Sequence, residues 1–170
     1  MASDHVQHPG DGALGLGAVH HELLGRREEQ RRLAALLHGA REGRAGVLVL
    51  QGEAGIGKSA LLRDLAKNAD DFRICRAAGV ESEMELAYAG LQQLCRPLSG
   101  LAELTGLHRN VLDQVFGLAE GAVRPERFLV GIAALELVAN VAKKQPILWL
   151  VDDAQWIDQA SMQAIGFVGR

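Results

Sequence analysis

The sequence predicts an α/β fold in which helices cover a parallel β-sheet. The apolar runs at 46–51 and 147–151 lack polar alternation, which is typical of strands buried on both faces. A further short strand is expected at 72–78, and segments with apolar residues at helical spacing lie between these runs. Strands that alternate with helices favour parallel pairing, because the chain must cross back to start the next strand at the same end.

The first part of the chain divides into a tail and two helices. Residues 1–20 are rich in Gly, His and Asp without periodicity, so we expect a disordered tail. Leucines at helical spacing predict a helix over about 26–40, which Gly43 and Gly46 end. Another helix, over 60–69, presents one broad apolar face.

The later helices follow from similar spacing and from the position of proline. Pro97 ends one helix, Gly106 interrupts the next, and Pro125 suits the first turn of a third. The expected helical ranges are about 86–98, 101–119, 126–143 and 159–168.

One run matches the phosphate-binding loop pattern G-x-x-x-x-G-K-[ST] at every fixed position, between a predicted strand and a predicted helix. Its glycines let backbone N–H groups turn toward a phosphate, and the helix N-terminus adds donors and a positive dipole end. Lys58 can reach the β- and γ-phosphates, and the Ser59 hydroxyl can bind Mg²⁺. The predicted nucleotide-binding residues of this loop are Gly52, Glu53, Ala54, Gly55, Ile56, Gly57, Lys58 and Ser59.

A pair of acidic residues follows the apolar run 147–151, which is the Walker B pattern. A buried strand delivers Asp152 to the carboxyl end of the sheet, where its carboxylate can hold Mg²⁺. Asp153 points to another side and could orient or deprotonate a hydrolytic water, so Asp153 and Lys58 are the candidate catalytic residues. By itself a strand that ends in Asp-Asp is often only a turn.

Composition argues against several other classes of protein. The net charge of −3 gives no strong field to attract nucleic acid or an anionic membrane. Cys75 and Cys95 form no metal-ligand pattern, and we expect both thiols to be reduced and buried. The absence of a signal-peptide pattern and of an apolar stretch long enough to cross a bilayer predicts a cytoplasmic location.

Four segments together resemble a known family. They are Leu24-Gly25-Arg26 with its helix, the loop 52–59, the run ESEMELAYAGLQQL at 81–94, and LVDDAQWID at 150–158. Over about residues 22–170 the chain is similar to the N-terminal ATPase portion of large bacterial LuxR-type transcriptional regulators of the MalT-like, AAA/STAND class. The loop is generic to many NTPases, whereas the 81–94 and 150–158 runs are much more specific.

The resemblance implies a P-loop NTPase of the AAA/ASCE type: a three-layer sandwich with a parallel sheet and a helical insertion at about 81–143. It implies ATP and Mg²⁺ as ligands, and it places Gly25 and Arg26 near the adenine. An acidic residue often follows that arginine in the family, whereas this chain has Arg27.

The resemblance also implies an incomplete sheet. In the related fold, the strand after Walker B inserts between the first and third strands. The chain ends one helix after Walker B, so we expect a partial ATPase domain with unpaired strand edges.

Three functions remain open from the sequence. One is an ATP–Mg²⁺ switch in a transcriptional regulator, with slow or no hydrolysis. Such a switch would self-associate or contact other domains of a longer protein. The second is a stand-alone ATPase, with Arg63, Arg124 or Arg127 as the arginine that stabilises charge. The third is a non-catalytic interaction module that uses residues 81–143. Direct DNA binding by this chain is not expected, because it has no helix-turn-helix pattern and a negative net charge.

Overall fold

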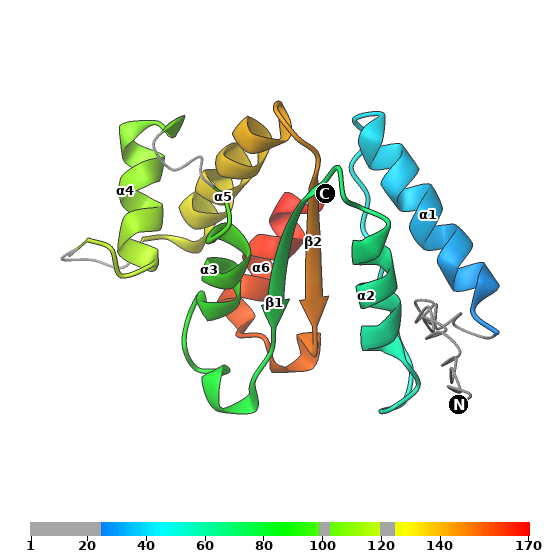
Figure 1. Ribbon diagram of the computed structural model, residues 1–170. Coiled ribbons are helices and arrows are strands. Elements are labelled where there is room, and N and C mark those ends of the chain that lie inside the picture. The colour runs from blue at the N-terminus through cyan, green and yellow to red at the C-terminus, as the bar shows by residue number, and fades with distance from the viewer. Residues whose placement is uncertain (1–24, 99–102, 120–124) are drawn as a thin grey trace, which may run out of the picture.

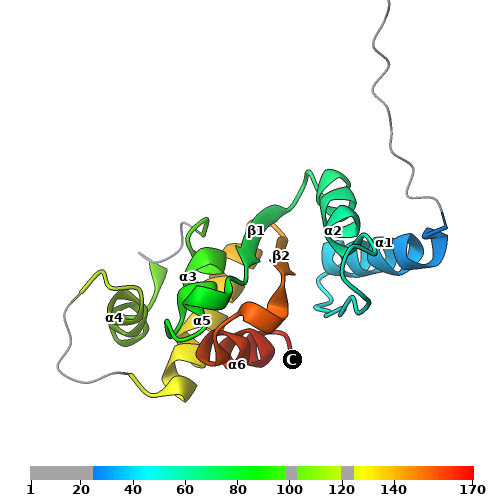
Figure 2. The ribbon, with the colours of Figure 1, turned by 90° about the horizontal axis from the view of Figure 1, so that it is seen from below.

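A computed structural model describes residues 25–98, 103–119 and 125–170, so the predicted tail at 1–20 lies outside the described residues. The molecule has a helical layer on each side of a small sheet (Figures 1 and 2). α1 and α2 lie on one side of the strands, and α3, α5 and α6 lie on the other, with α4 outermost. The bounds are α1 Arg27–Arg41, α2 Lys58–Lys67, β1 Arg73–Ala78, η1 Glu81–Glu83, α3 Ala89–Cys95, α4 Gly106–Val115, α5 Arg127–Ala142, β2 Ile147–Asp152, η3 Ala154–Trp156 and α6 Gln159–Val168.

The sheet confirms the predicted parallel pairing. β1 and β2 run side by side in a register that matches Arg73 with Ile147 and Ala78 with Asp152. Alternate side chains of β2 enter different layers: Leu148 and Leu150 pack with α1 and α2, whereas Trp149 packs with the helices of the opposite layer. The non-alternating apolar run therefore forms a strand covered on both faces.

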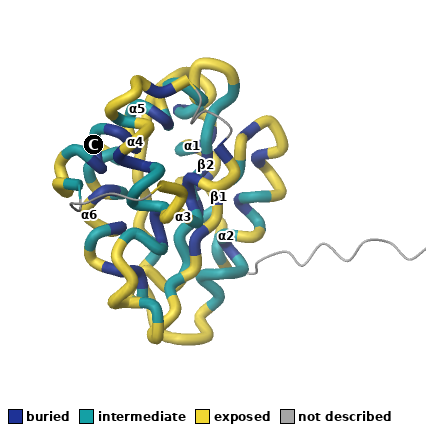
Figure 3. Tube along the Cα trace, turned by 90° about the vertical axis from the view of Figure 1, so that its left-hand side faces the viewer, coloured by how far each residue is buried: buried dark blue, intermediate teal, exposed yellow. Residues whose placement is uncertain are grey.

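Buried residues gather on the strands and on the inner faces of the helices (Figure 3). One cluster joins α1, α2, β2 and the turn before β1. The larger cluster joins β1 to α3, α4, α5 and α6, and it contains Leu91, Leu94, Leu112 and Leu137 with no exposed surface. Region 81–143 thus contributes its apolar side chains mainly to this core, which is the usual role of such a pattern.

The predicted strand at 46–51 is the main error in the sequence analysis. Residues 44–53 have no regular secondary structure, and Val47 and Val49 are 67% and 71% exposed. A cavity of about 410 Å³ separates this segment from β2, as its lining by residues 45–50 and by β2 shows. An apolar run favours a strand, but only a neighbouring strand can pair its backbone groups, and none lies beside these residues in the described part of the chain. Among the described residues β2 keeps one unpaired edge, whereas the edge expected on a strand at 46–51 is absent because that segment is not a strand.

The predicted helices are present; α1, α2, α5 and α6 lie close to their expected bounds, whereas α3 and α4 are clearly shorter than the predicted 86–98 and 101–119. α2 begins at Lys58, earlier than expected, because Gly57 caps it in a left-handed conformation. Gly106 starts α4 rather than breaking a longer helix. Pro125 precedes the cap of α5, Glu126, so it lies just before the first turn.

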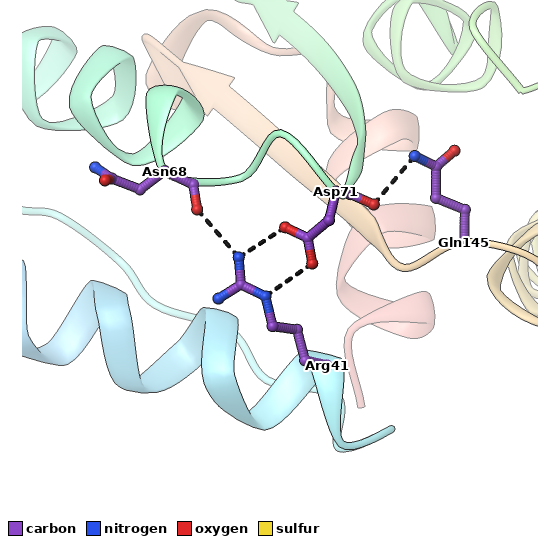
Figure 4. A network of polar contacts seen from close by, with 4 residues as sticks. All are labelled: Arg41, Asn68, Asp71 and Gln145. Atoms are coloured by element: carbon purple, nitrogen blue, oxygen red, sulfur yellow. Dashed lines mark hydrogen bonds and ion pairs between the residues drawn. The ribbon is translucent and has the colours of Figure 1, made fainter.

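A polar network fastens α1 to the turn before β1 (Figure 4). The Arg41 guanidinium donates to both carboxylate oxygens of Asp71, at 2.8 and 2.7 Å, and to the Asn68 carbonyl at 3.2 Å. The Arg41 guanidinium carbon also lies 5.2 Å from the centre of the Phe72 ring. Gln145, just before β2, donates to the Asp71 carbonyl, so the network reaches both layers around the start of the sheet.

Both cysteines are free and buried in the larger core, as predicted. Burial raises the pKa of Cys75 to about 11 and that of Cys95 to about 12. Within the described ranges, every helix is too short or too polar to cross a membrane.

Candidate nucleotide-binding site

The loop between residue 51 and α2 has the backbone conformation that its glycines permit. Gly55 and Gly57 have positive φ angles of 76° and 95°, which L-residues rarely adopt. A Cβ added at either glycine would meet no atom within 4 Å, so the backbone angle rather than crowding requires glycine there. Among the described residues, the amides of Gly57, Lys58 and Ser59 donate to no protein acceptor, so they remain available to an anion at the N-terminus of α2.

Lys58 closes over this loop. Its ammonium nitrogen lies 2.8 Å from the carbonyl oxygen of Gly52 and 2.8 Å from that of Glu53. These neutral carbonyls accept from the ammonium without cancelling its charge. The side chain is therefore in place to exchange the two carbonyls for phosphate oxygens.

Gly25 and Arg26 reach the loop from the start of α1. Gly25 has a φ of 80°, and Arg26 is the residue that precedes the first turn of the helix. The Arg26 guanidinium donates to the Ile56 carbonyl at 2.7 Å and to the Glu29 carboxylate at 2.8 Å. Arg26 thus braces the loop directly, and its predicted place near an adenine stays a prediction.

The acidic pair lies where the carboxyl end of β2 leaves the sheet. Asp152 is the last residue of β2, and its carboxylate accepts from the Asp153 amide at 3.1 Å. Asp153 has a φ of 49°, in the left-handed region that aspartate tolerates better than most side chains. Its carboxylate accepts from the Gln155 side-chain amide at 3.3 Å, so each carboxylate keeps one oxygen without a partner among the described residues.

One cavity brings the two predicted sites together. Lys58, Asp152 and Asp153 all line the cavity of about 410 Å³ between segment 45–50 and β2. Ser59 lies on the first turn of α2, next to Lys58. Ser59 and Asp152 would supply few protein ligands to a metal, which fits Mg²⁺ held jointly with phosphates and water. Of loop 52–59, Lys58 lines this cavity, and Gly57 and Ser59 are its chain neighbours. A cation and two carboxylates beside one space, next to a helix N-terminus, fit a nucleotide–Mg²⁺ complex.

A buried carboxylate that sequence reasoning did not single out anchors the segment after Asp153. The Asp158 side chain is 3% exposed and caps α6 through the Ser161 amide at 2.8 Å. It also accepts from the Tyr88 amide at 2.8 Å and from the Gly90 amide at 3.2 Å, at the start of α3. The Ser161 hydroxyl accepts from the Leu91 amide at 2.8 Å. Aspartate just before a helical segment is the sequence signal for the cap, but it carries no sign of the α3 contacts.

Two glycines allow the same segment to lie close to the sheet and to α3. A Cβ on Gly79 would come within 2.3 Å of the Asp153 carbonyl oxygen, and one on Gly90 within 2.9 Å of Ile157. The Gly79 amide donates to the Asp152 carbonyl at 3.0 Å. Residues 79–91 thus form the support on which the acidic end of β2 rests.

Comparison with known proteins identifies the family of the chain. The sequence pattern of the AAA ATPase domain family matches residues 22–170. The chain belongs to that family of P-loop ATPase domains, which bind ATP with Mg²⁺.

The chain is also similar to one curated protein along part of that protein's length. An uncharacterized protein of Rhizobium meliloti (strain 1021) is 25% identical over 178 aligned residues, which cover 87% of this chain. The match spans 17% of that protein's length. No solved structure matches the chain.

Proposed function

We propose that this chain is the ATP–Mg²⁺-binding switch of a larger transcriptional regulator, with slow or no hydrolysis by the chain alone. Residues 22–170 act as one cytoplasmic ATPase-type unit, with region 81–143 inserted between the two nucleotide motifs. The ligand contacts are assigned to loop 52–59, with Asp152 and Ser59 at the metal and Gly25 and Arg26 toward the base.

The observation that carries nucleotide binding is the convergence of the two motifs on one cavity. Lys58 is the first residue of α2, and Lys58, Asp152 and Asp153 line the same cavity. Phosphate oxygens need such donors, and the metal that accompanies them needs such carboxylates.

Slow hydrolysis is supported by the composition of the cavity wall. Lys58 lines the cavity and is positively charged. The described residues that line the cavity include no arginine. Arg127, a candidate for that role, instead donates to Gln163 across the α5–α6 surface. Efficient phosphoryl transfer generally uses an additional positive charge to stabilise the transition state.

The regulatory role rests on the resemblance in residues 81–94 and 150–158 to LuxR-type regulators. In the structure these two runs touch through Asp158 and the start of α3. The contact would transmit a change at the acidic end of β2 to the helical region, where partner domains or further copies would sense it.

Calorimetry with ATP and Mg²⁺ on the chain and on the Lys58→Ala variant tests nucleotide binding. We expect saturable binding that weakens at least tenfold in Lys58→Ala, because the variant loses the ammonium at the phosphates. Lys67→Ala, at the exposed end of the same helix, is the matched control and should bind normally. Equal binding by Lys58→Ala would refute the assigned site.

A phosphate-release assay separates the switch from a stand-alone ATPase. Nucleotide that stays bound without release of phosphate supports the switch. Steady turnover that disappears in Asp153→Asn would instead identify an independent enzyme.

A further inference from the structure

Two polar contacts and an apolar cluster hold α1 against α2 (Figures 1 and 2). Near the start of α1, the Gln30 side-chain amide donates to the Asp64 carboxylate at 3.2 Å. At the other end, the Arg41 guanidinium donates to the Asn68 carbonyl, which follows the last turn of α2. The packing of the two helices therefore positions the residues at the start of α1.

The Arg26 side chain connects this helix start to loop 52–59. Its guanidinium donates through one terminal nitrogen to the Ile56 carbonyl at 2.7 Å and through the other to the Glu29 carboxylate at 2.8 Å. The Arg26 and Glu29 side chains are 28% and 35% exposed, so both are partly screened from water. Because a guanidinium is planar and its N–H groups diverge at fixed angles, the Glu29 contact sets the direction in which the other nitrogen donates.

The group that accepts from this nitrogen belongs to a peptide bond within the loop. Ile56 lies between Gly55 and Gly57, whose left-handed φ angles leave this stretch with little intrinsic stiffness. In a trans peptide, the carbonyl oxygen of one residue and the amide hydrogen of the next point in opposite directions. A hydrogen bond to the Ile56 carbonyl therefore fixes the direction of the Gly57 amide, which has no protein acceptor among the described residues.

We propose that Arg26 is a positioning residue for phosphate binding: its guanidinium, oriented by Glu29, holds the Ile56–Gly57 peptide so that the Gly57 amide faces the phosphate groups. This role rests on the proposed function, and it leaves the backbone of residues 25 and 26 toward the base. Arg26 then strengthens nucleotide binding without touching the nucleotide, because the loop is ordered before the ligand arrives.

The partners of Arg26 differ from those of Lys58 in a way that favours this role. Lys58 donates to two neutral carbonyls, which it can exchange for phosphate oxygens. Arg26 is paired with a carboxylate, so moving it to a ligand would break a charge-assisted hydrogen bond. Arg26 is also absent from the described residues that line the cavity beside Lys58 and the acidic pair. The geometry thus suits Lys58 for direct phosphate contact and Arg26 for support of the loop.

Calorimetry with two ligands separates support of the loop from contact with the base. ATP–Mg²⁺ carries a base, whereas tripolyphosphate–Mg²⁺ has the phosphates alone. We expect Arg26→Ala to weaken both ligands by the same factor, at least about fivefold, because the loop loses its preorganisation. Arg27→Ala removes the same charge from the next, exposed position and should leave both affinities nearly unchanged. A loss confined to ATP would overturn the proposal in favour of a base contact, and equal losses in the two variants would overturn it in favour of a general charge effect.

Glu29→Ala distinguishes orientation of the guanidinium from the effect of charge. This variant makes the chain more positive, which by itself would favour an anionic ligand. We expect it nevertheless to weaken both ligands, at least about twofold, because the guanidinium loses the partner that orients it. Glu28→Ala is the matched control that should weaken neither ligand, since the partners of Glu28 are the exposed Arg31 and Arg32. Tighter binding by Glu29→Ala would refute the proposal, because it would show a released guanidinium in direct contact with the phosphates.

Nitrogen-15 relaxation of the chain without ligand measures the loop directly. We expect the order parameter of the Gly57 amide to fall below about 0.6, the range of a flexible backbone, in Arg26→Ala but not in Arg27→Ala. An unchanged order parameter in Arg26→Ala would also contradict the proposal. Should circular dichroism show that Arg26→Ala is unfolded, Glu29→Ala carries the same test. A fall in the order parameter of a chain that binds neither ATP nor tripolyphosphate would refute the proposed function and still support the role of Arg26 in the loop.

Discussion

At the scale of single residues, the loop depends on backbone angles that only glycine adopts readily. Gly57 has a φ of 95° and directly precedes α2, while Lys58 and Ser59 begin the helix. No neighbouring atom would clash with a side chain at 57. Glycine at position 57 therefore favours stability because it adopts this backbone angle without strain. The same angle sets the direction of the amides at the nucleotide site.

Gly57→Ala should destabilise the fold by about 1 kcal/mol, the usual cost of a left-handed angle in an L-residue. Gly166→Ala is the matched control, because Gly166 lies within α6 and its added Cβ also meets no atom within 4 Å. That change should stabilise the fold by about 0.5 to 1 kcal/mol, since alanine favours the helix. Urea denaturation measures both values, and shifts of the same sign would contradict this explanation.

At the scale of elements, Asp158 connects three parts of the fold. Its carboxylate caps α6, receives the first amides of α3, and holds the segment that follows the acidic pair. These amides are largely hidden from water, so they have no alternative partner when the carboxylate is removed.

Asp158→Ala should lower the free energy of unfolding by about 3 kcal/mol, because a cap and buried charge-assisted hydrogen bonds are lost together. Asp158→Asn keeps an acceptor oxygen and should cost less. Thermal and urea unfolding give the values, and Asp70→Ala at an exposed position is the control with little expected effect. A loss at Asp158→Ala no larger than that at Asp70→Ala would rule out the anchoring role.

The helices and strands also differ in how well the sequence predicted them. Helix spacing predicted α1, α2, α5 and α6 within a few residues, because each helix satisfies its own backbone and needs only an apolar face. The run at 46–51 failed as a strand because a strand depends on a partner supplied by another part of the polypeptide. The loop and the acidic pair were recognisable as motifs. The Asp158 contacts were not, since they join residues 68 and 70 positions apart.

At the scale of the whole molecule, the α1–α2 layer is joined to the sheet by one apolar cluster and by the Arg41–Asp71 network. The cavity of about 410 Å³ opens between this layer and the rest of the protein. Motion of the layer would therefore change the distance between Lys58 and the acidic pair. The polar network acts near the end of the sheet opposite the nucleotide site, where β1 and β2 begin.

Asp71 should make stability depend on acid. The hydrogen bond from Arg41 holds the pKa of Asp71 below its ordinary value of 3.8. Its contribution is therefore complete above pH 3.8 and disappears as the pH falls through the lowered native value. Asp71→Asn should remove this part of the acid dependence, as unfolding measured from pH 6 down to about pH 2 would reveal. An unchanged pH profile in the variant would show that the ion pair contributes nothing.

The two sealed thiols have a practical consequence for spectroscopy. With pKa values raised to about 11 and 12, Cys75 and Cys95 carry almost no thiolate at neutral pH, and bulky reagents cannot reach them in the native state. Two cysteines introduced on opposite sides of the cavity beside β2 could thus take dyes or spin labels selectively in the otherwise unaltered chain. Distances across the opening could then be followed during ligand addition without first replacing the native sulfur atoms.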